Sequence, residues 1–361
     1  MSSVLLNEPI LFGSDPNIKD NVFIASAQVE ESEALKDHTL VQEVLRELRK
    51  CIRAKGVDAK LLRLADEPKG HILYASKGDS VFPNNCISFH NFTDDKGVIV
   101  RRVVILYPMS LYRRGELPNE QLIDKLKRAA EEKLIQLVDL RGFEAENRCL
   151  EGTGALNFSY DGAYVYMSRS GRTDDALLDI VCSEDNLKIP KERRFVFSSA
   201  TPRADGGEDL VYHTNVVGWC GKRICAWALD LLRFESDNAR NAFYEHLLRE
   251  YDCILKLSAK EISHYAGNAF ELTGRTADGA ELPFLCISNT ALDNLDSRNW
   301  NLLGRWYGPE NVLGFMGEVL ERRAGGSIRC VMGASFTVGN VYPAVGEPST
   351  LEHIGVVDCS E

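Results

Sequence analysis

The sequence predicts an α/β fold in which one unit of helix and strands is repeated. Five blocks with helical periodicity start near residues 33, 118, 173, 236 and 289, and short strand-like runs lie between them. Hydrophobic residues make up 44% of the 361 residues and charged residues 26%, which is typical of a globular protein. Five repeats in such a chain would each span about 72 residues. A two-domain α+β protein is the alternative that composition leaves open.

Each helical block is defined by apolar residues that recur at intervals of three and four positions. This spacing places them on one face of a helix, which can then pack against a sheet. The predicted apolar faces consist of Leu40, Val41, Val44, Leu45, Leu48 and Ile52 in block 33–55, of Leu122, Ile123, Leu126, Ala129 and Ala130 in block 118–135, and of Ala242, Phe243, Leu247 and Leu248 in block 236–251.

Several residues mark the expected helix ends. Asp174 and Asp175 suit the start of block 173–183, because acidic side chains are favourable at a helix N-terminus. Ser236 is a predicted N-cap. The last block, 289–323, is predicted as two helices that break near Gly308-Pro309, and Gly325-Gly326 ends it.

The strand-like runs are short, rich in β-branched or aromatic residues, and bounded by Gly, Asp or Asn. They outnumber the helices. The predicted strands are Val98–Leu106, Ala163–Met167, Arg194–Phe197, Ile254–Leu257, Pro283–Ile287 and Ser327–Met332.

The net charge is acidic, since 42 Lys and Arg face 53 Asp and Glu, which gives −11. This balance argues against sequence-independent nucleic-acid binding, which needs clustered cations. No stretch approaches the ~20 apolar residues of a membrane span, and the first residues lack the basic and apolar regions of a secretory signal. We therefore expect a cytoplasmic protein without nucleic-acid or membrane partners.

The ten cysteines show no C-x-x-C pair, and the sequence has no H-E-x-x-H motif. No metal site, disulfide framework or cofactor is therefore expected. Most of the cysteines are interpreted as small buried hydrophobic residues. The remaining question is whether one of them is a nucleophile.

The first polar motif is Leu150-Glu151-Gly152-Thr153-Gly154. Glycines allow a sharp bend or a close approach of a ligand, so a glutamate at the end of a strand beside them can point into a pocket. A turn with a solvated glutamate is the alternative. The motif is not a dinucleotide loop, because Asn157 stands where the third glycine would be.

The second motif is Val211-Tyr212-His213-Thr214-Asn215-Val216, in which one histidine lies within a run of strand formers. Histidine can act as a general acid or base near neutral pH. A structural histidine is the alternative. By comparison, His38 and His246 are expected on helix surfaces.

The third motif is Gly325-Gly326-Ser327-Ile328-Arg329-Cys330, where a strand-like run carries a cysteine beside an arginine. Nearby cations favour the thiolate, which is the nucleophilic form of cysteine. A core cysteine on a strand is the alternative. Together the three motifs supply a nucleophile, an acid/base and a carboxylate that are far apart in sequence, as catalytic sets commonly are.

Further short motifs run in order with these three from about residue 79 to residue 332. They are Phe82-Pro83-Asn84-Asn85, Tyr107-Pro108-Met109, Arg113-Arg114-Gly115-Glu116, Ala163-Tyr164, Ser168, Arg172-Thr173-Asp174 and Ala266-Gly267-Asn268. The whole set resembles the pentein superfamily of arginine deiminases, dimethylarginine dimethylaminohydrolases and amidinotransferases. The chain looks most like its amidinotransferase-like or citrulline-hydrolase-like branch.

The resemblance implies a fold and a domain organisation. The fold would be a five-bladed, pseudo-fivefold α/β propeller of ββαβ-type modules around a polar channel. Residues 1–361 would form a single catalytic domain.

The resemblance also implies a role for each matching residue. Cys330 would be the nucleophile, His213 the acid/base, and Glu151 the carboxylate that grips the substrate nitrogens. Arg172 and one of Arg113 or Arg114 would hold an amino-acid carboxylate, for which planar guanidinium groups are well suited. Asn84, Asn85 and Asn215 would complete the substrate site.

Asn85 and Asn215 stand where many relatives carry aspartate. A cationic guanidinium favours carboxylates, whereas an asparagine amide can both donate to and accept from a neutral ureido group. The sequence therefore predicts a cysteine-dependent hydrolase of the C–N bond of a ureido or guanidino amino acid, citrulline first and arginine second. Amidino transfer through the same covalent intermediate and a non-catalytic binding protein are the alternatives. The expected partner is a small amino-acid substrate, and a homodimer is left open.

Overall fold

The computed structural model describes residues 3–9, 12–13, 31–63, 78–116, 120–203, 205–339 and 341–358. Within these ranges the strands form four sheets, and the chain has the α/β fold that the sequence predicts. Cys359 and the first residues of predicted block 118–135 lie outside the described residues.

One arrangement of strands and helices occurs five times in the described part of the chain. Two antiparallel strands are followed by a helix and then by a strand parallel to the second. In the first two units the elements are β3 (Ile87–Thr93), β4 (Ile99–Leu106), α3 (Glu120–Glu131) and β5 (Gln136–Asp139), then β6 (Leu156–Phe158), β7 (Val165–Arg169), α5 (Asp175–Val181) and β8 (Arg194–Pro202).

In the next two units they are β10 (Gly218–Cys220), β11 (Ile224–Trp227), α7 (Asp237–Glu250) and β13 (Cys253–Lys256), then β14 (Phe270–Arg275), β15 (Glu281–Ser288), α9 (Asn289–Asn294), α10 (Ser297–Tyr307) and β16 (Val312–Phe315). The fifth unit joins distant parts of the chain. It consists of β17 (Gly333–Val338), β1 (Ser3–Glu8), α1 (Glu31–Ala54) and β2 (Asp58–Arg63).

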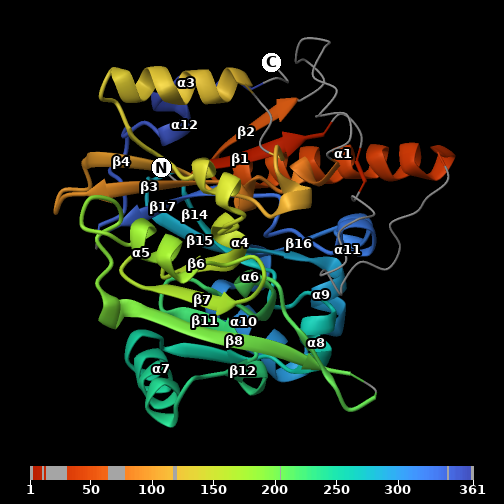
Figure 1. Ribbon diagram of the computed structural model, residues 1–361. Helices are drawn as coiled ribbons and strands as arrows, with labels where there is room; N and C mark the ends of the chain where they lie inside the picture. Colours follow the sequence, from red (N-terminus) through yellow and green to blue (C-terminus); the bar gives the residue numbers. More distant parts are fainter. Residues whose placement is uncertain are drawn as a thin grey trace.

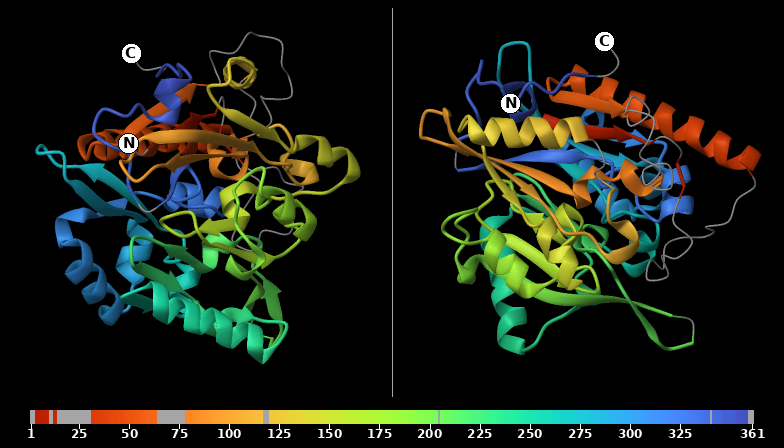
Figure 2. Two further views of the ribbon diagram at one scale, coloured as in Figure 1. Left: turned by 90° about the vertical axis from the view of Figure 1, so that its left-hand side faces the viewer. Right: turned by 45° about the horizontal axis from the view of Figure 1, so that its top comes forward.

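The fifth unit is continuous with the first, because β17 pairs antiparallel with β1 and parallel with β3. This pairing produces a six-stranded sheet in the order β2-β1-β17-β3-β4-β5. Figure 1 shows this sheet below α1 and α3, with the strands of the second and third units beyond it, and Figure 2 gives two further views.

Shorter elements connect the units or flank them. The additional strands are β9 (Glu208–Leu210) and β12 (Leu232–Arg233), and the additional α-helices are α4 (Gly152–Ala155), α6 (Thr214–Val217), α8 (Ala259–Ser263), α11 (Glu318–Ala324) and α12 (Thr350–His353). The 3₁₀ turns are η2 (Gly78–Val81), η3 (Pro83–Asn85), η4 (Leu111–Arg113), η5 (Arg141–Glu146), η6 (Lys191–Arg193), η7 (Leu229–Leu231) and η8 (Pro309–Asn311).

The long helices follow the predicted periodicity with two exceptions. Asp174 and Ser236 cap α5 and α7 by accepting hydrogen bonds from backbone N–H groups at 3.0 and 3.1 Å, as predicted. Leu40 and Leu248 are exposed instead of buried. His246, expected on the surface, is buried because its ring lies 2.7 Å from the Tyr166 hydroxyl.

Two predictions of secondary structure are wrong. Block 289–323 contains a strand, β16, between α10 and α11, which the helical pattern on either side concealed. Residues 327–332 form a turn, in which the Cys330 N–H donates to the Ser327 carbonyl at 2.9 Å, and the strand begins only at Gly333. The apolar residues of this turn are buried because it lies inside the protein, so burial imitated a strand pattern.

Candidate active site

A turn precedes the first strand of each unit, and three of these turns, η3, α4 and α6, pack together through α4 (Figure 1). Each turn carries a small or polar residue two or three positions before its strand. These five residues are Asn85, Gly154, Asn215, Asn268 and Cys330. The first strands of all five units therefore begin beside one polar site.

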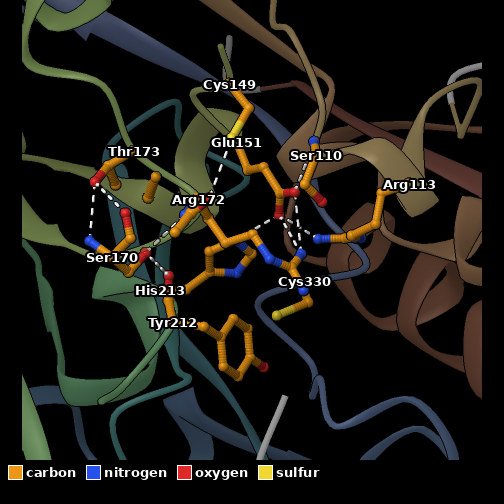
Figure 3. Close-up of polar contacts among 12 residues, drawn as sticks. Ser110, Arg113, Cys149, Glu151, Ser170, Arg172, Thr173, Tyr212, His213 and Cys330 are labelled. Carbon is orange, nitrogen blue, oxygen red and sulfur yellow. Dashed lines mark hydrogen bonds and ion pairs between the residues drawn. The ribbon is translucent and has the colours of Figure 1, made fainter. Parts of the chain in front are cut away.

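Glu151 is the centre of this site. It is not on a strand, as the sequence suggested, but occupies the N-cap position of α4 and is fully buried. Its carboxylate accepts hydrogen bonds from Arg113 Nη1 at 2.5 Å and from Arg172 Nη1 at 2.9 and 3.0 Å. His213 Nε2 lies 2.8 Å from Glu151 Oε2, and the Ser110 N–H donates to Oε1 at 3.2 Å. Figure 3 shows these groups around the carboxylate.

The two neighbouring arginines Arg113 and Arg114 lie in different environments. Arg113 is buried, and its Nε and Nη2 atoms each donate to the Glu116 carboxylate at 2.7 Å while Nη1 binds Glu151. Arg114 Nη2 instead donates to Asn147 Oδ1 at 3.0 Å. Of this pair, the structure brings Arg113 to the Glu151 cluster.

The charges of the cluster fix the protonation of Glu151. Burial alone would raise the pKa of the Glu151 carboxyl, but Arg113, Arg172 and His213 outweigh burial and hold this pKa well below its usual value. Glu151 is therefore ionised at neutral pH and can only accept hydrogen bonds.

His213 occupies the N-cap position of α6 and is not on a strand. Burial lowers the pKa of His213 to about 4, although the hydrogen bond with Glu151 acts in the opposite direction. The imidazole is therefore neutral at neutral pH. Since the ionised Glu151 must receive a proton from Nε2, we assign the proton to Nε2 and the lone pair to Nδ1.

Cys330 is buried beside two amides. Asn268 Nδ2 lies 3.3 Å from Cys330 Sγ and Asn215 Nδ2 lies 3.7 Å from it. Asn268 Nδ2 also donates to the Asn215 carbonyl at 3.0 Å, which fixes its orientation. In Figure 3 the sulfur, the His213 ring and the Glu151 carboxylate are gathered around the same space.

Three buried asparagines have side-chain atoms without a hydrogen-bond partner among the described residues. These atoms are Asn84 Nδ2 and Oδ1, Asn85 Oδ1 and Asn215 Oδ1. An unpaired buried polar atom is costly unless a ligand or water satisfies it. The three asparagines are thus available to a polar ligand in the site.

Gly154 keeps this region open. A Cβ atom at position 154 would lie 2.2 Å from Asn85 Oδ1 and 2.8 Å from His213 Nδ1. These approaches are far shorter than van der Waals contact. The glycine therefore allows Asn85 and the lone-pair nitrogen of His213 to lie side by side.

The structure thus brings together Glu151, His213, Arg113 and Arg172 through direct contacts, and it joins Cys330 to Asn215. The sequence analysis missed Asn268, Glu116 and Arg329 as site residues. A detectable signal existed for Asn268, because the pattern of a small or polar residue followed by Cys, Ala or Val precedes the first strand in all five units.

Within the described ranges, no group of three or more His, Cys, Asp or Glu side chains is placed to hold a metal ion. The helices in the same ranges include none that is both long enough and apolar enough to cross a membrane.

Solved structures share this fold at low sequence identity. Apo ArgZ, an arginine dihydrolase from cyanobacteria, superposes with a TM-score of 0.60 and 12% identity over 96% of this chain. This chain spans only 42% of ArgZ. The N-terminal domain of ArgZ bound to product gives a TM-score of 0.59 and 14% identity, covering 94% of this chain and 99% of that domain. DDAH from Pseudomonas aeruginosa in complex with citrulline gives 0.50 and 12%, covering 92% and 98%.

No curated protein sequence matches the chain. The family model described as N,N dimethylarginine dimethylhydrolase, eukaryotic, matches residues 8–337, which include every residue of the Glu151 cluster and Cys330. The chain therefore belongs to the N,N-dimethylarginine dimethylhydrolase family, within the pentein superfamily of guanidino-modifying enzymes, and is a hydrolase of carbon–nitrogen bonds other than peptide bonds.

Proposed function

We propose that the chain hydrolyses the C–N bond of a ureido or guanidino amino acid, citrulline first and arginine as the alternative, through a covalent adduct on Cys330. The observation that carries this proposal is the convergence of Cys330, His213 and Glu151 from three separate turns (Figure 3). A variant of the N-terminal domain of ArgZ has been solved covalently bound to a reaction intermediate, which supports an adduct in this fold.

The proposed first step begins with neutral His213, whose pKa is about 4. The Cys330 proton passes to His213 Nδ1 while the sulfur forms a bond to the ureido carbon. His213 then returns this proton to the leaving nitrogen, the C–N bond breaks, and ammonia departs. The product of this step is a thiocarbamate on Cys330.

In the proposed second step His213 Nδ1 takes a proton from water, and the resulting hydroxide attacks the thiocarbamate carbon. The S–C bond breaks, and the proton returns to the sulfur. Citrulline would thus yield the carbamate of ornithine, which loses carbon dioxide. Arginine would follow the same course through an amidino adduct and yield citrulline and ammonia.

The charges around the site favour a neutral reacting group. Glu116 and Glu151 are matched by Arg113 and Arg172, so these four buried side chains sum to zero charge. A cationic guanidinium would find no uncompensated carboxylate among them. The unpaired amide atoms of Asn84, Asn85 and Asn215 can both donate to and accept from a ureido group.

In this proposal Arg172 and Arg113 share their N–H donors between Glu151 and the substrate's α-carboxylate. Each guanidinium has five N–H donors, which allows one group to serve two carboxylates. Glu116 would hold Arg113 in position for both contacts. Arg114, which contacts Asn147, would lie at the edge of the site.

We also propose that the five units form the five-bladed, pseudo-fivefold propeller that the family resemblance implies, and that residues 1–361 are one catalytic domain. The same strand order in all five units supports this arrangement. The cytoplasmic location and a homodimer stay predictions from the sequence.

The test is to incubate the protein with citrulline, arginine, N,N-dimethylarginine and agmatine and to analyse amino acids and ammonia. Consumption of citrulline, with ornithine and ammonia formed in equal amounts, is expected. A folded protein that consumes none of these compounds would contradict the proposal. Addition of glycine as an amine acceptor tests the transfer alternative, which a new amidino product would favour.

A further inference from the structure

Arg329 is a buried cation that the catalytic proposal does not use. Only 3% of the residue is exposed. The buried Arg113, Arg172 and Arg323 all pair with carboxylates. Within the described ranges, by contrast, no carboxylate forms an ion pair with Arg329. A buried charge without a counter-ion is expensive, so its position requires an explanation.

The neutral contacts of Arg329 hold its guanidinium firmly. Nη1 donates to the Met332 carbonyl at 2.7 Å, and Nη2 donates to Thr153 Oγ1 at 2.8 Å. Thr153 Oγ1 in turn donates to the Asn84 carbonyl at 3.1 Å. The guanidinium carbon lies 4.0 Å from the centre of the Phe270 ring. Arg329 therefore connects the turn of Cys330 to the turns of Glu151 and Asn84.

The residue next to Arg329 in the chain is the one group nearby that can become its counter-ion. We propose that Arg329 is a positioning residue whose buried charge stabilises negative charge on the Cys330 sulfur and whose two hydrogen bonds fix the turn that carries Cys330. This inference rests on the proposed role of Cys330 as nucleophile.

The other polar groups around the sulfur have the same polarity. The amides of Asn215 and Asn268 direct their Nδ2 atoms toward Cys330 Sγ. Burial lowers the pKa of Arg329 to about 10, against an opposing effect of Cys330, so the guanidinium stays charged at neutral pH.

Charged and titratable groups approach Cys330 from every neighbouring element. They are Arg113 on η4, Glu151 before α4, Arg172 before α5, His213 before α6, Tyr265 after α8, Glu321 on α11 and Arg329 itself. Since Glu151 and Glu116 are matched by Arg113 and Arg172, Arg329 supplies the uncompensated positive charge of this set.

The inference adds no reactant to the proposed mechanism. When the Cys330 proton passes to His213 Nδ1, the sulfur keeps the electron pair, and Arg329 stabilises the resulting charge without exchanging a proton. The same charge develops again when the S–C bond breaks. Arg329 would thus act in both steps through the sulfur.

The experiment measures the rate of Cys330 alkylation by iodoacetamide between pH 5 and 10, with the labelled peptide identified by mass spectrometry. Burial raises the pKa of Cys86, Cys149 and Cys182, so these thiols should contribute little, and Cys330→Ala defines the background. Arg329→Gln keeps amide donors for Met332 and Thr153 but removes the charge. It should slow alkylation about tenfold at pH 7 and move the pH profile upward by about one unit.

Two variants separate charge from structure. Arg329→Lys keeps the charge and should retain most of the wild-type profile, whereas Thr153→Ala removes one hydrogen bond of Arg329 and should leave the profile in place. A folded Arg329→Gln protein with the wild-type profile would overturn the inference, as would an equal shift in Thr153→Ala. If Arg329→Gln does not fold, Arg329→Met provides the same comparison, and loss of folding in both while Arg329→Lys folds with a shifted profile would also overturn it.

Alkylation needs no substrate, so the two proposals can fail separately. A shifted profile in a protein that turns over none of the tested substrates would leave this inference standing and contradict the proposed function. Turnover of citrulline with an unshifted Arg329→Gln profile would do the reverse.

Discussion

Glu151 and His213, 62 residues apart in sequence, meet through a hydrogen bond of 2.8 Å, and each occupies the N-cap position of a one-turn helix. Glu151 thereby fixes the proton of His213 on Nε2 and leaves Nδ1 as the basic atom, beside Gly154 and Asn85. The acid/base of the proposed reaction is oriented by a carboxylate that two arginines keep ionised.

Replacing Cys330 by alanine should abolish turnover, because the covalent adduct cannot form. The free energy of unfolding should change by no more than about 1 kcal/mol, since a small buried side chain is replaced by another of similar size. Steady-state kinetics and urea denaturation check the two parts. The Cys149→Ala protein is the control, and a Cys330→Ala protein with wild-type turnover would refute the assignment.

Glu151→Gln should lower both activity and stability. It removes the negative charge that Arg113 and Arg172 share, and it leaves two buried guanidinium groups without an adequate counter-ion. The expected loss is roughly 3 kcal/mol in the free energy of unfolding. Urea denaturation measures this loss, with Glu146→Gln as a surface control. Equal stability of the two variants would show that the cluster is not energetically coupled.

Asn85→Asp should shift substrate preference toward cationic guanidines. A carboxylate beside Gly154 and His213 would favour a guanidinium over a neutral ureido group by charge-assisted hydrogen bonds. The ratio of kcat/KM for arginine to that for citrulline should rise about tenfold, equivalent to about 1.4 kcal/mol. Asn147→Asp, at the contact with Arg114, is the control. An unchanged ratio would count against the ureido argument.

Gly154→Ala should reduce turnover about a hundredfold or more, because a misplaced catalytic group loses its orientation. The new methyl group would overlap Asn85 Oδ1 and His213 Nδ1, so at least one of them must move. Gly142→Ala is a matched control, since nothing lies within 4 Å of a Cβ atom there. Similar kinetics for the two variants would be inconsistent with the close packing around Gly154.

The protein should lose stability as the pH falls below about 6.5, where unfolded histidines gain protons. Burial lowers the pKa of His213 and His246 to about 4 and that of His90 to about 3, so these side chains stay neutral in the folded protein. Glu271 acts in the opposite direction, because burial raises its pKa to about 7 and the folded protein keeps its carboxyl proton.

The balance of three histidines against one glutamate predicts a loss of roughly 2 kcal/mol per pH unit between pH 6 and pH 5. Urea denaturation at pH 7, 6 and 5 measures it. Glu271→Gln removes the opposing contribution and should make the pH dependence steeper. Stability that rises from pH 6.5 to pH 5 would contradict the prediction.

The sequence predicted the α/β fold and the long helices well, because α1, α3 and α7 each have a periodic apolar face. It did not predict β16, whose four residues are too few to show a period between two helices. It also placed Glu151, His213 and Cys330 on strands, although all three lie in turns. Buried turns are as apolar as strands, and local pattern does not separate them.

The family resemblance supplied the catalytic residues, but the contacts among them required the structure. Arg113 and Arg114 are equivalent in sequence, and only their surroundings show that Arg113 reaches Glu151. Glu116 and Arg329 carried no signal of their own, since a charged residue in a loop is normally solvated. Their burial depends on contacts with residues far away in the chain.

The pairing of β17 with β1 has a consequence for the order in which the protein becomes active. The Cys330 turn leads directly into β17, whose partners β1 and β3 belong to the first third of the chain. During synthesis the Glu151 cluster can assemble early, whereas the nucleophile is held only once the last strand has found a strand made some 330 residues before it, Ala334 pairing with Val4. Contacts of such sequence separation form slowly. A nascent or partly folded chain should therefore carry its arginine–glutamate–histidine cluster without catalytic activity, and completion of this single pairing would act as the final step of maturation.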